Sequence, residues 1–156
     1  RYNQSLGGGA ILDAGGYVIK LGSLLLDNPH ICTSETRFLP GFEVDMLGSA
    51  TLQDENEMIY QGAWGMANFY QCSLELWTDR YKITTNRIFT APPNFSPLYY
   101  IESQDEINEI SLDPDDHFLN SIEHFADLIV NQQLRKDREK KISNQAKLVE
   151  NIIKQR

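Results

Sequence analysis

Apolar residues recur at helical spacing near the start of the chain and at alternate positions further along. Residues 10–26 contain no proline and place apolar side chains three and four residues apart, which predicts a helix. The chain then contains five runs in which apolar and polar side chains alternate, a pattern typical of half-buried strands. These runs cover residues 30–38, 46–53, 57–66, 69–78 and 81–89.

The links between the later runs are short, which restricts how the strands can pair. Residues 54–56, 67–68 and 79–80 are too few for a crossover helix, so we expect neighbouring strands to be antiparallel. Two further segments, residues 98–101 and 107–112, are predicted edge strands. The chain is therefore predicted to have an α+β fold, with one open, mainly antiparallel β-sheet and helices on one face.

Two amphipathic segments predict helices at the end of the chain. Asp113 and Pro114 are expected to be the N-cap and first residue of the first of these helices. Apolar residues then fall on one face of each helix. They are Phe118, Ile122, Phe125 and Ile129 in the first helix, and Ile142, Ala146, Val149 and Ile153 in the second.

Composition narrows the function classes. The 156 residues fit one domain, and a net charge of −8 argues against nucleic acid as a partner. No apolar run approaches the roughly 20 residues of a membrane span. Cys32 and Cys72 indicate neither a metal site nor a disulfide framework, and the three histidines lack metal-ligand spacing. We expect no metal, no membrane association and a cytoplasmic location. The start at Arg1 suggests a piece of a longer polypeptide.

One face of the predicted sheet is a candidate partner surface. Phe69 and Trp77 are large apolar residues at positions expected to face away from the helices, among the polar residues Gln71, Ser73 and Glu75. We expect this face to form a homo-oligomer. Coverage by another domain or by an insertion is the alternative.

The segment Gly7–Tyr17, GGGAILDAGGY, carries the candidate chemistry. Asp13 and Tyr17 are four residues apart, which places both side chains on one helix face, where a carboxylate can orient a phenol that gives or takes a proton. Gly15 and Gly16 each cost a helix about 1 kcal/mol relative to alanine, so close approach of another backbone or of a cofactor ring is expected there. From the residues alone, a purely structural Asp–Tyr pair remains open.

Arg87 and Asn86 are a second, weaker candidate site. They lie at the end of a predicted strand, where they could reach a polyol or a phosphate. An edge-of-sheet salt bridge is the alternative role for Arg87.

The run GGGAILDAGGY resembles the signature of the glucose–fructose oxidoreductase, inositol dehydrogenase and rhizopine catabolism (Gfo/Idh/MocA) family, which opens that family's C-terminal domain. The resemblance implies that Asp13 and Tyr17 lie at the active site. It also implies a cofactor, NAD or NADP, held mainly by an N-terminal domain. That domain's dinucleotide-binding glycines and its lysine in an E-K-P motif do not occur in these residues, so the chain alone is expected to be inactive.

The resemblance therefore predicts that residues 1–156 are a C-terminal substrate-binding and oligomerisation domain. The whole enzyme would transfer a hydride to or from a sugar, sugar-nucleotide or polyol carbon. Two alternatives remain open. One is a non-catalytic oligomerisation or regulatory module with the same fold, and the other is a reductase of a non-sugar substrate such as a dihydrodiol.

Overall fold

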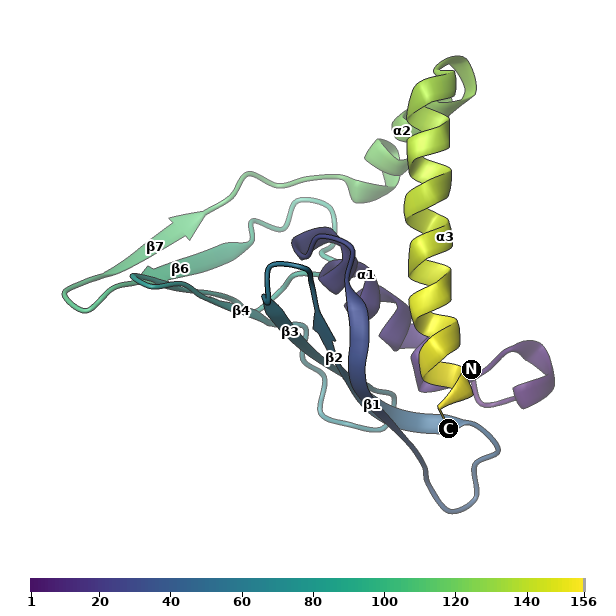
Figure 1. Ribbon diagram of the computed structural model, residues 1–156. Coiled ribbons are helices and arrows are strands. Elements are labelled where there is room, and N and C mark those ends of the chain that lie inside the picture. Colours follow the sequence, from purple (N-terminus) through teal and green to yellow (C-terminus); the bar gives the residue numbers. More distant parts are fainter. Residues whose placement is uncertain (156) are drawn as a thin grey trace. The chain divides into compact units, whose positions relative to one another are not determined.

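The computed structural model describes residues 1–155, which divide into two compact units (Figure 1). Unit 1 comprises residues 1–68 together with residues 135–155. Unit 2 comprises residues 69–134. No helix of the described chain combines the length and apolar character needed to cross a membrane.

Unit 1 contains a three-stranded antiparallel sheet with helical segments before and after it in sequence. The chain starts with a 3₁₀ turn, η1 (Gln4–Leu6), followed by one π-helical segment, η2 (Ile11–Gly15), which continues directly into α1 (Gly16–Leu25). The strands are β1 (His30–Phe38), β2 (Asp45–Gln53) and β3 (Ile59–Gly65), in the order β1-β2-β3. Most of the final helix, α3 (Gln132–Lys154), also belongs to this unit.

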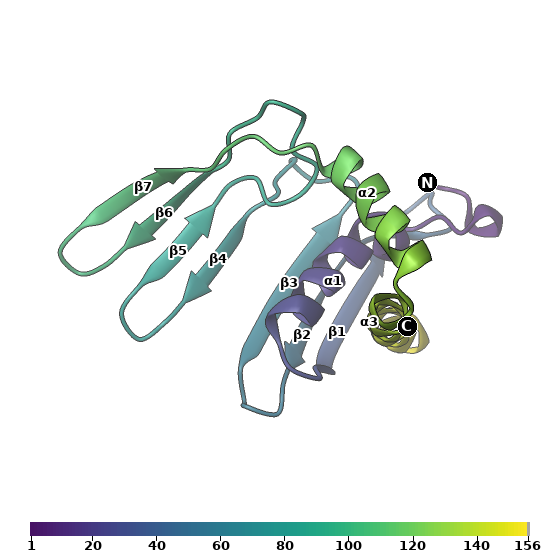
Figure 2. The same ribbon diagram turned by 90° about the horizontal axis from the view of Figure 1, so that it is seen from above.

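The core of unit 1 lies between the sheet and two helices. Figure 2 shows α1 lying across β2 and β3. Alternate residues of β2 point into this layer because side chains of a strand alternate between faces. The last turns of α3 close the same cluster. Its buried members are Ala10, Ile11, Ile19, Leu26, Ala50, Leu52, Trp64, Leu148 and Ile152.

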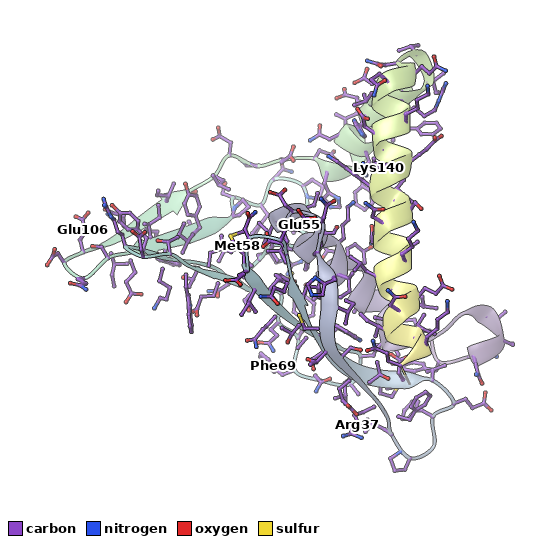
Figure 3. All side chains as sticks on the ribbon, in the orientation of Figure 1. Arg37, Glu55, Met58, Phe69, Glu106 and Lys140 are labelled. Carbon is purple, nitrogen blue, oxygen red and sulfur yellow. The ribbon has the colours of Figure 1, made fainter. Side chains whose placement is uncertain are left out.

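The β2–β3 turn is held by a buried carboxylate. Asp54 is 4% exposed and accepts hydrogen bonds from the backbone N–H groups of Asn56 (2.9 Å), Met58 (3.0 Å) and Asp27 (3.2 Å). The first two bonds close the turn, where Figure 3 labels Glu55 and Met58. The third joins the turn to the segment that follows α1.

Unit 2 is a four-stranded antiparallel meander followed by a helix. The strands are β4 (Leu74–Trp77), β5 (Lys82–Thr85), β6 (Leu98–Glu102) and β7 (Ile107–Ser111), in the order β4-β5-β6-β7. The helix α2 (His117–Val130) comes next. Every residue of this unit retains some exposure, and none is as buried as the core residues of unit 1.

The predicted α+β class is confirmed, with antiparallel strands and three α-helices. The predicted helix over residues 10–26 corresponds to η2 and α1, and the run over residues 30–38 matches β1. However, the strands form two sheets rather than one. The run over residues 69–78 contains only the short strand β4, because Cys72 makes an isolated parallel bridge to Arg87 instead of continuing the ladder.

Two smaller expectations were wrong. The segment 98–101 was expected at a sheet edge, but β6 pairs with both β5 and β7. The N-cap of α2 is Asp116 rather than Asp113. The Asp116 carboxylate accepts hydrogen bonds from the backbone N–H groups of Phe118 (3.1 Å) and Leu119 (3.0 Å), which is the geometry that satisfies a helix start.

Candidate functional site

The glycine run leads directly into the helix that carries Asp13 and Tyr17. Gly9 has φ +127, a conformation that side-chain-bearing residues rarely adopt, and a Cβ at this position would collide with the Asp45 carboxylate. Position 9 therefore requires glycine for two reasons, its backbone conformation and its close contact with Asp45. Both features bring the start of β2 against the start of the helix formed by η2 and α1, which we call the signature helix.

Asp45 is the buried anchor of this helix start. Its side chain is fully buried, and Oδ2 accepts a hydrogen bond of 2.8 Å from the backbone N–H of Ile11. The first N–H groups of a helix have no partner within the helix, and negative charge is favoured at that end. Asp45 thus satisfies one of these donors with a charge-assisted bond from another element, which fixes where η2 begins.

Asp13 lies in the π-helical turn η2, and Tyr17 follows it as the second residue of α1. Turns of this kind are rare in proteins, and many of those that do occur lie at functional sites. Tyr17 is 55% exposed, whereas Ile11 is fully buried. The Asp13 carboxylate pairs with the Arg1 guanidinium, with 3.2 Å between Nε and Oδ1. The segment therefore presents its two ionisable side chains outward on a rigid base.

Gly15 and Gly16 have different surroundings. A Cβ on Gly15 would lie 2.8 Å from Ile11 Cδ1 and 3.0 Å from the Trp64 ring, so this glycine admits the indole of β3 into the core. The expected close approach at Gly15 was that of another backbone or of a cofactor ring, whereas in the structure the Trp64 side chain occupies that place. Gly16 has open space around its Cα, and its carbonyl accepts a hydrogen bond of 2.9 Å from Gln145 Nε2 of α3.

Arg87 and Asn86 lie in unit 2, whereas Asp13 and Tyr17 lie in unit 1. Arg87 donates from Nη2 to the Thr90 carbonyl (2.8 Å), and its guanidinium carbon lies 5.5 Å from the centroid of the Tyr70 ring. Its Nε is buried without a hydrogen-bond partner in the described chain. Within residues 1–155 the guanidinium forms no salt bridge, so the alternative role foreseen for Arg87 has no support there.

No model of a known protein family matches the chain. Curated relatives do. The chain is 31% identical over 127 residues to a dTDP-3,4-didehydro-2,6-dideoxy-alpha-D-glucose 3-reductase of Saccharopolyspora spinosa, which covers 81% of this chain and 38% of the relative. It is 29% identical over 153 residues to the reductase of the same description from Actinomadura kijaniata, which covers 97% of this chain and 46% of the relative.

Solved structures agree with these relatives. The 3-ketoreductase KijD10 from Actinomadura kijaniata, in complex with NADP and TDP-benzene, superimposes with a TM-score of 0.89 at 28% identity, covering 95% of this chain and 46% of KijD10. The chain is homologous to the C-terminal half of these dTDP-sugar 3-ketoreductases, in the Gfo/Idh/MocA family. It spans less than half the length of the relatives it matches.

Three residues that shape the segment Gly7–Tyr17, the signature segment, were not predicted from the sequence. Asp45 precedes a predicted strand and gives no sign that it is buried. Trp64 lies in the predicted strand over residues 57–66, but nothing in the spacing pairs it with Gly15. Lys20 lies on the signature helix, where a lysine is ordinarily solvated, yet its Nζ is buried. Each contact joins residues far apart in sequence or depends on how helices pack, so no local pattern could have indicated it.

Proposed function

We propose that this chain is the substrate-binding half of an NADP-dependent reductase that acts on the keto carbon of a nucleoside-diphosphate sugar. The observation that carries the proposal is the anchored, outward-facing Asp13–Tyr17 segment, in a chain homologous to dTDP-sugar 3-ketoreductases. The described residues contain no glycine-rich strand–turn–helix that would cradle a dinucleotide. The nucleotide cofactor would therefore be held mainly by protein outside this chain.

The chain's own part in the reaction concerns binding and proton transfer. The cofactor supplies the hydride, with its two electrons, to the ketone carbon. The ketone oxygen then needs a proton, and the Tyr17 hydroxyl is proposed to donate it or relay it. Asp13 is proposed to orient the phenol electrostatically from the preceding turn. A lysine of the N-terminal domain that the family resemblance implies would share this role. Because the Trp64 ring occupies the space beside Gly15, Gly16 is the position open to close approach by a ligand.

Replacing Tyr17 by phenylalanine tests this role. In the full-length enzyme, Tyr17→Phe should lower the single-turnover rate of ketone reduction by roughly 10²-fold, the lower end for a lost general acid, since a lysine shares the task. Stability should barely change because no buried volume is removed. Asp13→Asn should have a smaller effect. Tyr81→Phe, which makes the same change at an exposed tyrosine of unit 2, is the matched control. An unchanged rate for Tyr17→Phe would exclude the proposed role.

A second copy of the chain is proposed to cover the exposed face of unit 2. Phe69, labelled in Figure 3, is 93% exposed, and Trp77 is 80% exposed. On the same sheet face as Trp77, the Lys82 ammonium pairs with Glu102 at 2.6 Å. A mixed aromatic and charged face of this kind suits a symmetric contact. Light scattering on full-length protein should show a dimer or larger assembly that Trp77→Glu weakens, and a strict monomer at high concentration would exclude it.

A further inference from the structure

We propose that Lys20, Arg138 and Lys141 form a site for the phosphate oxygens of a nucleotide ligand, on the surface where α1 meets α3. The proposal rests on the proposed function for the identity of the ligand. It rests on the structure for the site itself. Neither the family resemblance nor the known relatives' descriptions assign a role to these three residues.

The two helices meet at a defined contact, which brings the three cations together. Gln145 of α3 donates its side-chain N–H to the Gly16 carbonyl of α1 at 2.9 Å. Lys20 lies four residues after Gly16, so it is on the same side of α1. Arg138 and Lys141 lie seven and four residues before Gln145, which places them on the same side of α3. Figures 1 and 2 both show α1 and α3 side by side.

The Lys20 ammonium is in an unusual position. Its Nζ is buried from solvent and has no hydrogen-bond partner in the described chain. Burial lowers the pKa of Lys20, and the positive charges of Arg138 and Lys141 lower it further. Buried polar groups are nearly always paired, because leaving an ammonium unpaired in a poorly solvated place is costly.

The cluster contains no countercharge of its own. Within residues 1–155, none of the three side chains forms a salt bridge with a carboxylate. Arg138 is half-buried and Lys141 is exposed, so the cluster opens to solvent on the Lys141 side. Three converging cations repel one another, and an anion entering from that side would relieve the repulsion and supply the missing acceptor for Lys20.

A phosphate group is the anion that this set of donors suits best. An arginine fork and two lysine ammonium groups can together engage several oxygens of a diphosphate. Lys20 is three residues from Tyr17, on the adjacent part of the α1 surface, so a ligand held here would lie next to the proposed reacting group. Both ligands bound by KijD10, TDP-benzene and NADP, carry such phosphates.

The test uses full-length protein and calorimetric titration with dTDP, thymidine and NADP⁺. Lys20→Met removes the charge and keeps most of the apolar stem. It should weaken dTDP binding by roughly 10- to 100-fold, the value of one lost charge-assisted hydrogen bond, and leave thymidine binding unchanged. Arg138→Gln and Lys141→Gln should have smaller effects in the same direction. Lys140→Gln, on the neighbouring surface of α3 (Figure 3), is the matched control and should bind like the parent.

Two outcomes of the titrations show whether the phosphate belongs to the substrate or to the cofactor. Weakened binding of dTDP alone assigns the site to the substrate, and weakened binding of NADP⁺ alone assigns it to the cofactor. Inorganic pyrophosphate should raise the melting temperature of the parent protein but not that of Lys20→Met, a difference that a merely structural lysine would not produce.

Unchanged affinity for both nucleotides in Lys20→Met would overturn the proposal, and so would an equal loss of thymidine binding. The first result would mean that a protein carboxylate from outside this chain pairs with the cluster. Failure of the proposed function looks different. A protein that reduces no nucleotide-linked ketose, yet binds pyrophosphate in a Lys20-dependent way, would retain the anion site and lose the proposed reaction.

Discussion

Unit 1 and unit 2 differ most in how they bury apolar side chains. All the buried hydrophobic residues of the described chain lie in unit 1, where two helices cover one face of a three-stranded sheet. Unit 2 has a sheet of four short strands and an amphipathic helix, yet none of its residues is buried. Its helix alone leaves Phe118, Ile122, Phe125 and Ile129 each more than 60% exposed.

The difference indicates that the two units obtain their stability in different ways. Folding must offset a large loss of chain entropy, and apolar burial is the main term that does so. Unit 1 contains such burial within the described chain and can therefore hold the signature segment rigidly. Unit 2 has hydrogen-bonded strands but little burial, so we expect it to depend on contacts with protein outside this chain.

Two tryptophans provide the strongest test of this comparison. Trp64 of unit 1 is 6% exposed and fills the space left by Gly15 and Gly48, whereas Trp77 of unit 2 is 80% exposed. Trp64→Ala should lower the free energy of unfolding of the chain by about 3–5 kcal/mol. At concentrations where the chain is monomeric, Trp77→Ala should change it by no more than about 0.5 kcal/mol. Denaturant unfolding of both variants measures the difference, and similar losses would contradict the proposed contrast.

Asp45→Asn tests the anchor of the signature segment. Asparagine keeps the size and one acceptor oxygen of aspartate but removes the charge that faces the Ile11 N–H and the start of the helix. We expect a loss of about 1–3 kcal/mol in the free energy of unfolding, as for other buried hydrogen bonds to a charged group. In the full-length protein, the proposed ketone reduction should slow as well. Full stability in Asp45→Asn would show that the charge is not needed to hold the helix.

The sequence predicted best what local patterns determine. In the alternating run over residues 46–53, Met46, Ala50 and Leu52 fall on one face, and all three are buried. Trp64, in the run over residues 57–66, is also buried. The glycine run and the spacing of Asp13 and Tyr17 identified a helix that the structure confirms, because helical periodicity is read within a few residues.

The sequence predicted least well what depends on contacts between distant segments. The alternation of apolar and polar residues does not show which strands share a sheet. The pattern of β4 is the one that a strand paired with β3 would also have. The Lys20 cluster depends on α3 packing against α1 more than 110 residues later, as the hydrogen bond from Gln145 to Gly16 shows. The N-cap of α2 was misplaced by three residues because four acidic or proline residues in a row offer several equivalent caps.

Acid should destabilise unit 1 through the β2–β3 turn. Burial raises the pKa of Asp54, but the three backbone N–H donors outweigh this effect and the pKa is lowered overall. A carboxyl group with a lowered folded-state pKa stabilises the fold above its ordinary value of about 3.9, and this contribution is lost as the pH falls through the folded-state pKa. Asp54→Asn should therefore flatten the acid limb of the stability curve. An identical pH dependence in parent and variant would assign acid unfolding to other groups.

The smallest effect is expected on the apolar face of α2. Ile122 is 68% exposed, so Ile122→Gln removes little buried surface and should change the free energy of unfolding of this chain by no more than about 0.5 kcal/mol. Ile19→Gln, at a fully buried position of α1, is the matched control and should cost several times more, since it buries an amide without a partner. The comparison becomes sharper in the full-length protein. If protein outside this chain covers α2, Ile122→Gln should there destabilise by more than about 1 kcal/mol, the usual size of a lost apolar contact. An equally small effect in both proteins would mean that α2 remains exposed in the full-length protein. The apolar face of α2 would then contribute nothing to the stability of unit 2.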